Sequence, residues 1–222
     1  TTDETYSEFA GFYDSLPSDV YALWDALMSE HPTYITRKFM GQDAFGYDMY
    51  VYHLKPATLD SPYTSVEKRP KIGVTCAVNG FEKETTLTMY LLARDMCKNW
   101  RTNKLLEALR FNVEFVVMPI LNPSGYVDKT YKNRNGVNIT FNFPYKFEEQ
   151  APLDPNDPFY GGTHALSEPE SQYVVQMLDD HPDFDAFIDF HSFEGLSAAS
   201  HPFVTYTSTT GGKIIPHMTQ ML

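Results

Sequence analysis

The hydrophobic and polar positions of this chain follow strand and helix periods in turn. Apolar residues alternate over residues 33–40 and again over 47–54, and the glycine-containing turn between them predicts a hairpin. Three nearly continuous apolar runs, at 71–78, 113–119 and 184–191, are typical of strands that are buried on both faces of a sheet.

Four further segments repeat their apolar residues at helical spacing. These predicted helices cover about residues 18–30, 84–99, 104–109 and 167–179. Ser18 is expected to cap the first helix, and Ser167 followed by Glu170 predicts a capping box at the last. A last helix is expected over 213–222. Strands that alternate with crossover helices predict an α/β domain with a largely parallel sheet.

Composition and charge narrow the classes of function. The net charge is −12, which disfavours nucleic acid and anionic membranes as partners. No apolar run approaches the roughly 20 residues that span a bilayer, so no transmembrane segment is expected. Cys76 and Cys97 fall in apolar patterns and are expected to be buried free thiols. These properties do not separate a secreted protein from a cytoplasmic one.

Polar residues with metal-binding chemistry follow the predicted central strands. Asn79 and Glu82 come after the first of these strands, Asn122 follows the second, and His191 closes the third. Ligands of open α/β sheets bind beyond the carboxyl ends of the strands, so these residues are expected at one edge of the sheet. Glutamate and histidine are zinc ligands, and a catalytic zinc site takes three protein ligands and a water. A lone histidine after a strand is also common as a structural residue, so both readings stay open.

Five motifs follow one another in order along the chain. They are Asn79-Gly80-Phe81-Glu82, Asn122-Pro123-Ser124-Gly125-Tyr126, residues 133–143, Tyr160-Gly161-Gly162 with Ser167-Glu168-Pro169-Glu170, and residues 188–193. Together they resemble the zinc carboxypeptidase family, the metallocarboxypeptidases that remove C-terminal residues from peptides. The resemblance extends from about Ser18 to the end of the chain.

This resemblance implies a fold, a cofactor and a class of partner. The family fold is a mixed, largely parallel eight-stranded sheet with helices on both faces, so residues 1–222 are expected to form a single α/β domain without its C-terminal strands. The family uses a zinc-bound water activated by a glutamate, and arginines grip the terminal carboxylate of the substrate. The expected partner is a peptide or a peptidoglycan-type stem peptide, and the family favours an extracellular or cell-envelope location.

Matching the motifs places the metal ligands of the family on Asn79, Glu82 and His191. Glu82 and His191 keep the residue types of the family. Asn79 stands where the family has histidine, and a carboxamide oxygen suits hard ions better than it suits zinc. The resemblance therefore implies a zinc site that is weak or lost.

The substrate-binding positions depart from the family as well. Thr140 and Phe141 stand where the family has the Asn-Arg pair that grips the terminal carboxylate. Tyr131 stands where an arginine polarises the substrate carbonyl, with Lys132 or Arg134 as alternative sources of charge. These replacements are expected to weaken the binding of a terminal carboxylate.

No catalytic residue is assigned within the chain. The general-base glutamate of the family would fall beyond Leu222, and Asp128 comes too early to replace it. One hypothesis is a non-catalytic member that binds a peptide or a glycan in an aromatic-rich groove. Another is an active metallohydrolase of altered specificity, with His164 or His201 as a spare ligand. A third is a piece of a longer protein that contains the missing glutamate.

Overall fold

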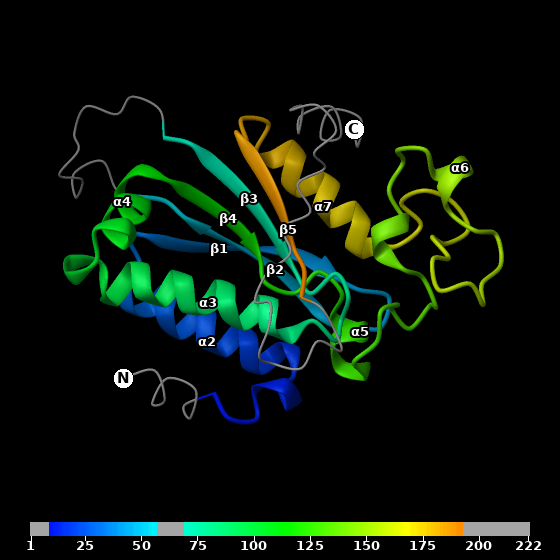
Figure 1. The fold of residues 1–222 in the computed structure, drawn as a ribbon, viewed down its shortest axis with the longest axis horizontal. Coiled ribbons are helices and arrows are strands. Elements are labelled where there is room, and N and C mark those ends of the chain that lie inside the picture. The colour runs from blue at the N-terminus through cyan, green and yellow to red at the C-terminus, as the bar shows by residue number, and fades with distance from the viewer. Residues whose placement is uncertain (1–8, 57–68, 193–222) are drawn as a thin grey trace.

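The computed structural model describes residues 9–56 and 69–192 of the 222-residue chain. Within them, five strands form one sheet in the order β1-β2-β4-β3-β5 (Figure 1). Their bounds are β1 Ile35–Gln42, β2 Asp48–Leu54, β3 Lys71–Cys76, β4 Glu114–Met118 and β5 Ala186–Phe190. β3, β4 and β5 are parallel to one another, whereas β1 and β2 run antiparallel to their neighbours. The expected α/β class with a mixed sheet is confirmed.

Helices cover both faces of this sheet (Figure 1). On one face pack α2 (Pro17–Glu30), α3 (Lys83–Lys98) and α4 (Lys104–Asn112), and on the other packs α7 (Pro169–Asp180). The remaining elements are short: α5 (Pro123–Asp128), α6 (Phe147–Gln150), and the 3-10 helices η1 (Phe12–Asp14), η2 (Trp100–Thr102) and η3 (Ile139–Phe141). Because parallel strands are buried on both faces, such a sheet needs a helical layer on each side.

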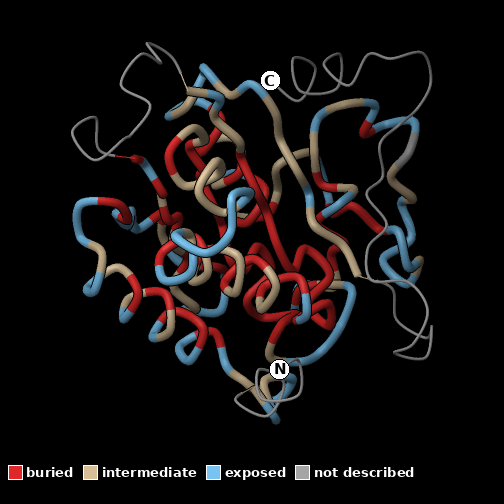
Figure 2. The backbone as a smooth tube through the Cα atoms, turned by 60° about the vertical axis from the view of Figure 1, so that its left-hand side comes forward, coloured by how far each residue is buried: buried red, intermediate tan, exposed pale blue. Residues whose placement is uncertain are grey.

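β4 shows how the sequence builds two hydrophobic cores. All five of its residues are buried, and successive side chains point to opposite faces. Phe115 and Val117 join the core under α2 and α3, whereas Val116 and Met118 join the core under α7. Buried residues accordingly run through the centre of the molecule (Figure 2). Burial of one such side chain contributes about 1.5–3 kcal/mol, which is why a continuous apolar run predicts a central strand.

The starts of two helices differ from the sequence expectation. α2 and α7 each begin at a proline, and the cap positions are occupied by Leu16 and Glu168. The predicted caps Ser18 and Ser167 are therefore wrong. Proline is favoured at the first helical position, because the N–H it lacks has no partner there, and it disfavours helical geometry in the residue before it.

β5 is less buried than its apolar sequence suggests. Its residues are half-buried or exposed, and among the described strands it pairs with β3 alone. The expectation of burial on both faces is not met within the described residues. The stretch 122–163, expected as a long loop, contains α5, η3 and α6.

Other expectations can be compared with the described residues only in part. Cys76 and Cys97 are buried free thiols, as expected. The helix expected over 213–222 and the spare ligand His201 lie outside the described residues. Within those residues, no helix has the length and apolar character needed to cross a membrane.

Candidate functional site

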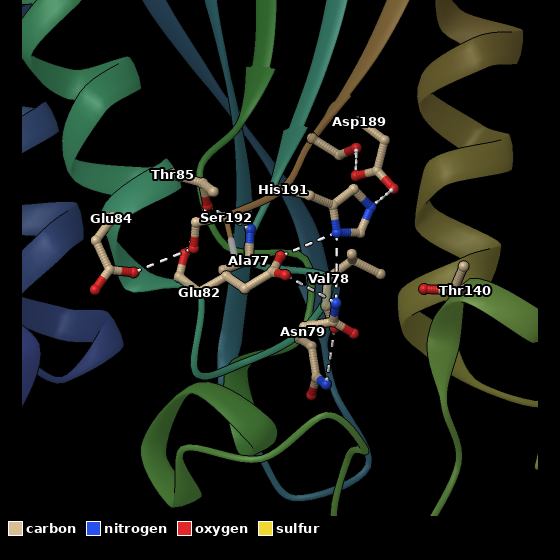
Figure 3. A network of polar contacts seen from close by, with 12 residues as sticks. Ala77, Val78, Asn79, Glu82, Glu84, Thr85, Thr140, Asp189, His191 and Ser192 are labelled. Atoms are coloured by element: carbon tan, nitrogen blue, oxygen red, sulfur yellow. Dashed lines mark hydrogen bonds and ion pairs between the residues drawn. The ribbon is translucent and has the colours of Figure 1, made fainter. Parts of the chain in front are cut away.

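The carboxyl ends of β3 and β5 bring Asn79, Glu82 and His191 together. The two strands are parallel neighbours, and Cys76 at the end of β3 pairs with Phe190 at the end of β5. After β3 the chain turns through Asn79 into α3, whose N-cap residue is Glu82, while His191 directly follows β5. Glu82 and His191 are 109 residues apart in sequence, and they meet as the strand order predicts (Figure 3).

His191 lies at the centre of this cluster. Its Nδ1 is 3.0 Å from Glu82 Oε2 and 3.4 Å from Asn79 Nδ2. Its Nε2 is 2.9 Å from Oδ2 of Asp189, whose Oδ1 accepts a 2.7 Å hydrogen bond from the Thr75 hydroxyl. Asn79 Nδ2 also donates to Glu82 Oε1 at 3.1 Å. Both nitrogens of the imidazole are thus engaged by carboxylates (Figure 3).

These two carboxylates decide the protonation of His191. Burial alone lowers the pKa of a histidine, but hydrogen bonds to Asp189 and Glu82 outweigh it and raise the pKa of His191 to about 10. The ring is then a cation that donates Nδ1–H to Glu82 and Nε2–H to Asp189. A metal ligand has to be a neutral imidazole with a free lone pair. His191 must therefore lose a proton and its bond to Glu82 before it can coordinate a metal through Nδ1.

The described side chains at this edge supply two groups that can bind zinc. Glu82, 3 % exposed, offers a carboxylate and His191 an imidazole, but Asn79 turns its Nδ2 toward both of them. Among the described residues, no three His, Cys, Asp or Glu side chains are placed to hold a metal ion. His164, one of the predicted spare ligands, is exposed and directs its Nδ1 to the carbonyl of Ala165. Two of the three donors that zinc requires are present.

The turn that holds Asn79 and Glu82 is supported closely from below. A Cβ atom on Gly80 would lie 1.9 Å from the carbonyl carbon of Gly125 in α5, so only glycine permits this approach. The hydroxyl of Thr85 donates to the Glu82 carbonyl at 2.7 Å. The position of Glu82 is therefore fixed by backbone packing and by the first turn of α3.

A buried lysine follows Glu82 directly. Lys83 is 1 % exposed, its Nζ donates to the carbonyl of Ser15 at 2.8 Å, and the ammonium lies 4.0 Å from the ring centre of Tyr126. Burial lowers the pKa of Lys83 to about 8. The ammonium ties the segment before α2 to the helix that begins at the candidate site. No local pattern in the sequence predicts this bond, because the partner lies 68 positions away.

Of the predicted substrate positions, Tyr131 lies beside the site, and the charge of Lys132 is bonded elsewhere. Tyr131 is 51 % exposed, and its ring meets Phe81 edge-on at 4.4 Å between centroids, beside the 79–82 turn. Lys132 Nζ donates to the carbonyl of Pro155 at 3.0 Å. Tyr131 therefore lies beside the turn that carries Asn79 and Glu82, whereas the ammonium of Lys132 is bonded to the Pro155 carbonyl.

Arg134 is also engaged elsewhere. Its guanidinium holds Asp128 with two hydrogen bonds of 2.8 and 2.9 Å, and it lies 5.4 Å from the ring centre of Tyr47. The predicted alternative source of charge is thus part of a surface ion pair. The same contact gives Asp128 a structural partner.

The clamp positions Thr140 and Phe141 carry no charge and lie on η3. Thr140 is exposed, and in the close-up view no interaction links it to the His191 cluster (Figure 3). Phe141 packs against Phe159, with 5.3 Å between the ring centroids. The structure therefore brings together the predicted metal positions, and it places an apolar pair at the predicted clamp.

Asp189 and Thr75 were not assigned a role from the sequence. Asp189 could have been predicted to lie beside His191. It precedes His191 by two positions, and residues two apart on a strand share a face. Thr75 could not have been singled out. It faces Asp189 because the two residues are register partners across β3 and β5.

A pocket of about 200 Å³ lies away from this site, between β1, β2 and the end of α7. His53 and His181 line it, with their ring centroids 5.3 Å apart. Burial lowers the pKa of both histidines, and for His53 a hydrogen bond to Glu114 opposes the effect. Glu114 begins β4, whereas His191 follows the end of the parallel strand β5, so the pocket is at the opposite end of the sheet.

Comparison with known proteins relates this chain to one protein family. A family model described as zinc carboxypeptidase matches residues 20–211. Carboxypeptidase A4 of Mus musculus is 26% identical over 201 residues, which cover 84% of this chain and 46% of that protein. The chain spans about half the length of the curated relatives it matches.

Solved structures show the same fold. Carboxypeptidase A from Helicoverpa armigera gives a TM-score of 0.68 at 21% identity, covering 82% of this chain and 47% of that one. Thrombin activatable fibrinolysis inhibitor gives a TM-score of 0.70 at 19% identity, covering 82% and 49% respectively.

Proposed function

Because the chain belongs to the zinc carboxypeptidase family, we propose that it is a member with lost or strongly reduced peptidase activity that retains a surface for binding a peptide or a glycan. The residue at the third ligand position is the main support. Asn79 presents an amide there, and its Nδ2, a donor, lies 3.1 Å from Glu82 Oε1 and 3.4 Å from His191 Nδ1. Zinc in proteins is bound by imidazole, carboxylate or thiolate groups, so an amide is a poor replacement.

The predicted carboxylate clamp gives independent support. An arginine that holds a carboxylate contributes a bidentate, charge-assisted pair. Thr140 and Phe141 provide no such group, and Arg134 is already paired with Asp128. A ligand with a free terminal carboxylate would have to be desolvated there without compensation, which is unfavourable.

Exposed aromatic rings support a binding role. Tyr131 is 51 % exposed and Phe159 is 54 % exposed, and both belong to the stretch that carries the predicted substrate positions. Aromatic faces bind apolar side chains and other planar or apolar groups well, and exposed rings of this kind are common at interaction sites. A peptide or a glycan fits this chemistry better than an anionic ligand.

The test is metal binding by the wild-type protein and the Asn79→His variant, measured by elemental analysis and by calorimetric titration with zinc. We expect little zinc in the purified wild type and a clear gain in the variant. A full structural site contributes roughly 10–16 kcal/mol, so one restored ligand should raise the affinity by about 100-fold or more. Asn156→His is the matched control, since it adds a histidine at an exposed position away from the cluster.

Two results would count against the proposal. Stoichiometric, tightly bound zinc in the wild type would mean that the donor set is complete. An equal gain of affinity in Asn79→His and Asn156→His would mean that residue 79 does not occupy a ligand position.

The second candidate function is an active metallohydrolase of altered specificity that removes C-terminal residues from peptides or cell-wall stem peptides. The approach of His191 Nδ1 to 3.0 Å from Glu82 favours it, because two ligands are already close together. Hydrolysis of unblocked and C-terminally amidated peptides by zinc-loaded protein separates the two functions. Release of C-terminal residues that stops on adding a chelator would support this second candidate.

A further inference from the structure

Three buried carboxyl groups gather between the β1–β2 turn and the start of α7. Asp43 and Glu168 are each 5 % exposed, and Glu170 is fully buried. Within the described residues, none of the three forms an ion pair with a lysine, an arginine or a histidine. Buried carboxylates are normally paired, because the desolvation of an isolated charge is very unfavourable.

The hydrogen bonds of this cluster are incomplete. Glu168 accepts bonds on both oxygens, from Ser167 and from two asparagine side chains. Asp43 accepts two backbone N–H bonds on Oδ1 alone, and Glu170 accepts one from Asn133 on Oε1 alone. Oδ2 of Asp43 and Oε2 of Glu170 are buried and have no partner.

The environment of Glu170 favours its neutral form. Burial, together with the nearby carboxylates of Glu168 and Asp43, raises the pKa of Glu170 to about 7. A hydrogen bond from Asn133 and the N–H of Glu170 itself oppose this effect. Glu170 also lies in the first turn of α7, where a helix favours negative charge, and burial still outweighs these contributions.

We propose that Glu170 is a positioning residue, which holds the 131–143 segment against α7 through Asn133 by keeping a proton on its buried carboxyl group. The proton removes one of three negative charges from the buried cluster.

Asn133 transmits the state of Glu170 to the segment. Its Nδ2 donates to Glu168 at 2.8 Å and to Glu170 at 3.1 Å. Its Oδ1 accepts the backbone N–H groups of Asn135 and Val137 at 3.1 and 3.0 Å, which shapes the loop.

The far end of the segment is fixed to the same place. Oδ1 of Asn142 accepts bonds from the Glu168 backbone and from the Ser171 hydroxyl. Thr140 and Phe141 lie between these two anchors. A change of charge at Glu170 therefore acts on the residues at the predicted clamp.

No cation of the segment compensates the cluster. Arg134 is paired with Asp128, and Lys132 donates to the Pro155 carbonyl. No group of three metal-binding side chains is present in the described ranges, 9–56 and 69–192. A proton is thus favoured over a metal ion as the compensating charge.

The direction of the pH effect follows from linkage. The pKa of Glu170 is higher in the folded protein than its ordinary value of 4.5. The proton therefore contributes its full stabilisation below pH 4.5, and that stabilisation is lost as the pH rises through about 7. The segment should therefore be held most firmly below about pH 4.5, should loosen as the pH rises to about 7, and should change little above that.

Hydrogen exchange of the amides in residues 133–143, corrected for the intrinsic rate at each pH, tests this in the free protein. In the wild type, the opening equilibrium should increase by up to about tenfold per pH unit between about pH 4.5 and 7, and it should level off at higher pH. Glu170→Gln keeps the shape of the side chain and cannot ionise, so its opening should be independent of pH. The prediction does not depend on what the surface binds.

Glu168→Gln is the matched control in the same cluster. It places an amide NH2 group among side chains that already donate hydrogen bonds. The amides of residues 133–143 should therefore exchange faster at all pH values, while the pH dependence of their exchange remains. Carboxyl-carbon NMR of Glu170 provides a second readout, with a midpoint expected near pH 7.

Three results would overturn the proposal. Parallel pH profiles for the wild type and Glu170→Gln would show that another group is responsible. A carboxyl midpoint near 4.5 would show that Glu170 carries no proton at neutral pH. Removal of the pH dependence by millimolar Ca²⁺ would show that the cluster binds a cation.

Discussion

The hydroxyl of Thr75 donates a 2.7 Å hydrogen bond to Oδ1 of Asp189, and this bond joins β3 to β5 directly behind His191. The other oxygen of Asp189 holds Nε2 of His191. A buried threonine in one strand thus orients a carboxylate in the next, and that carboxylate orients the histidine.

Thr75→Val should lower the free energy of unfolding by about 1–2 kcal/mol, because a hydrogen bond to a charged group is lost while the shape is kept. Urea denaturation measures this change. Thr75→Ser keeps the donor and should lose less than about 1 kcal/mol. Equal losses in the two variants would mean that packing of the methyl group, and not the hydrogen bond, supports Asp189.

Gly80→Ala should prevent folding or cost more than about 3 kcal/mol, because the added methyl group overlaps the backbone of Gly125. Gly136→Ala is the control, since Gly136 has a left-handed backbone (φ 76°) and open space around its Cα. It should cost about 1–2 kcal/mol for the conformation alone. Thermal unfolding of both variants compares the two costs, and similar values would contradict the steric account.

Arg134→Met should reduce stability only slightly, as expected for an ion pair that solvent screens. Asp128→Asn should cause a similar loss, and the double variant should be no worse than either single change. Binding of peptides with a free terminal carboxylate, measured by fluorescence anisotropy, should not change. A loss of binding of tenfold or more would identify Arg134 as the clamp and favour the metallohydrolase.

His181→Asn should make the protein less sensitive to acid. Burial and the nearby ammonium of Lys71 lower the pKa of His181 below its ordinary value of 6.5. The unfolded chain therefore takes up a proton first, so the stabilisation is complete above pH 6.5 and is lost as the pH falls towards the folded pKa. Denaturation midpoints at about pH 7.5 and 5.5 measure this. His164→Asn is the control, because His164 is exposed. In this variant the denaturation midpoints at the two pH values should differ by as much as they do in the wild type.

The central part of the fold could be predicted because each central strand is marked by a short apolar run in the sequence. The apolar runs at β3 and β4 define buried strands, and the carboxyl ends of parallel neighbours must emerge on the same side. For that reason Glu82 and His191 could be expected to meet. Their roles as metal ligands, and those of Tyr131, Lys132, Arg134, Thr140 and Phe141 towards a substrate, stay predictions.

The buried polar cluster around Glu170 could not be predicted. The sequence suggested that Glu170 belongs to a capping box, which is a local motif. In the structure its partner is Asn133, and Asp43 acts on it from the β1–β2 turn. Contacts between segments so far apart depend on how helices and loops pack on the sheet, and no periodic pattern in the sequence reports them. β5 was misjudged for a related reason, since an apolar run does not reveal which neighbours the strand has.

The bond between Lys83 and the carbonyl of Ser15 has a practical consequence for anyone who shortens the chain. If the residues before α2 were removed, a buried ammonium would lose its acceptor at the start of the helix that bears Glu82. Such a shortened protein would be expected to show altered metal affinity even though no residue of the cluster had changed. The residues around Ser15 should therefore be kept intact in any measurement of zinc binding.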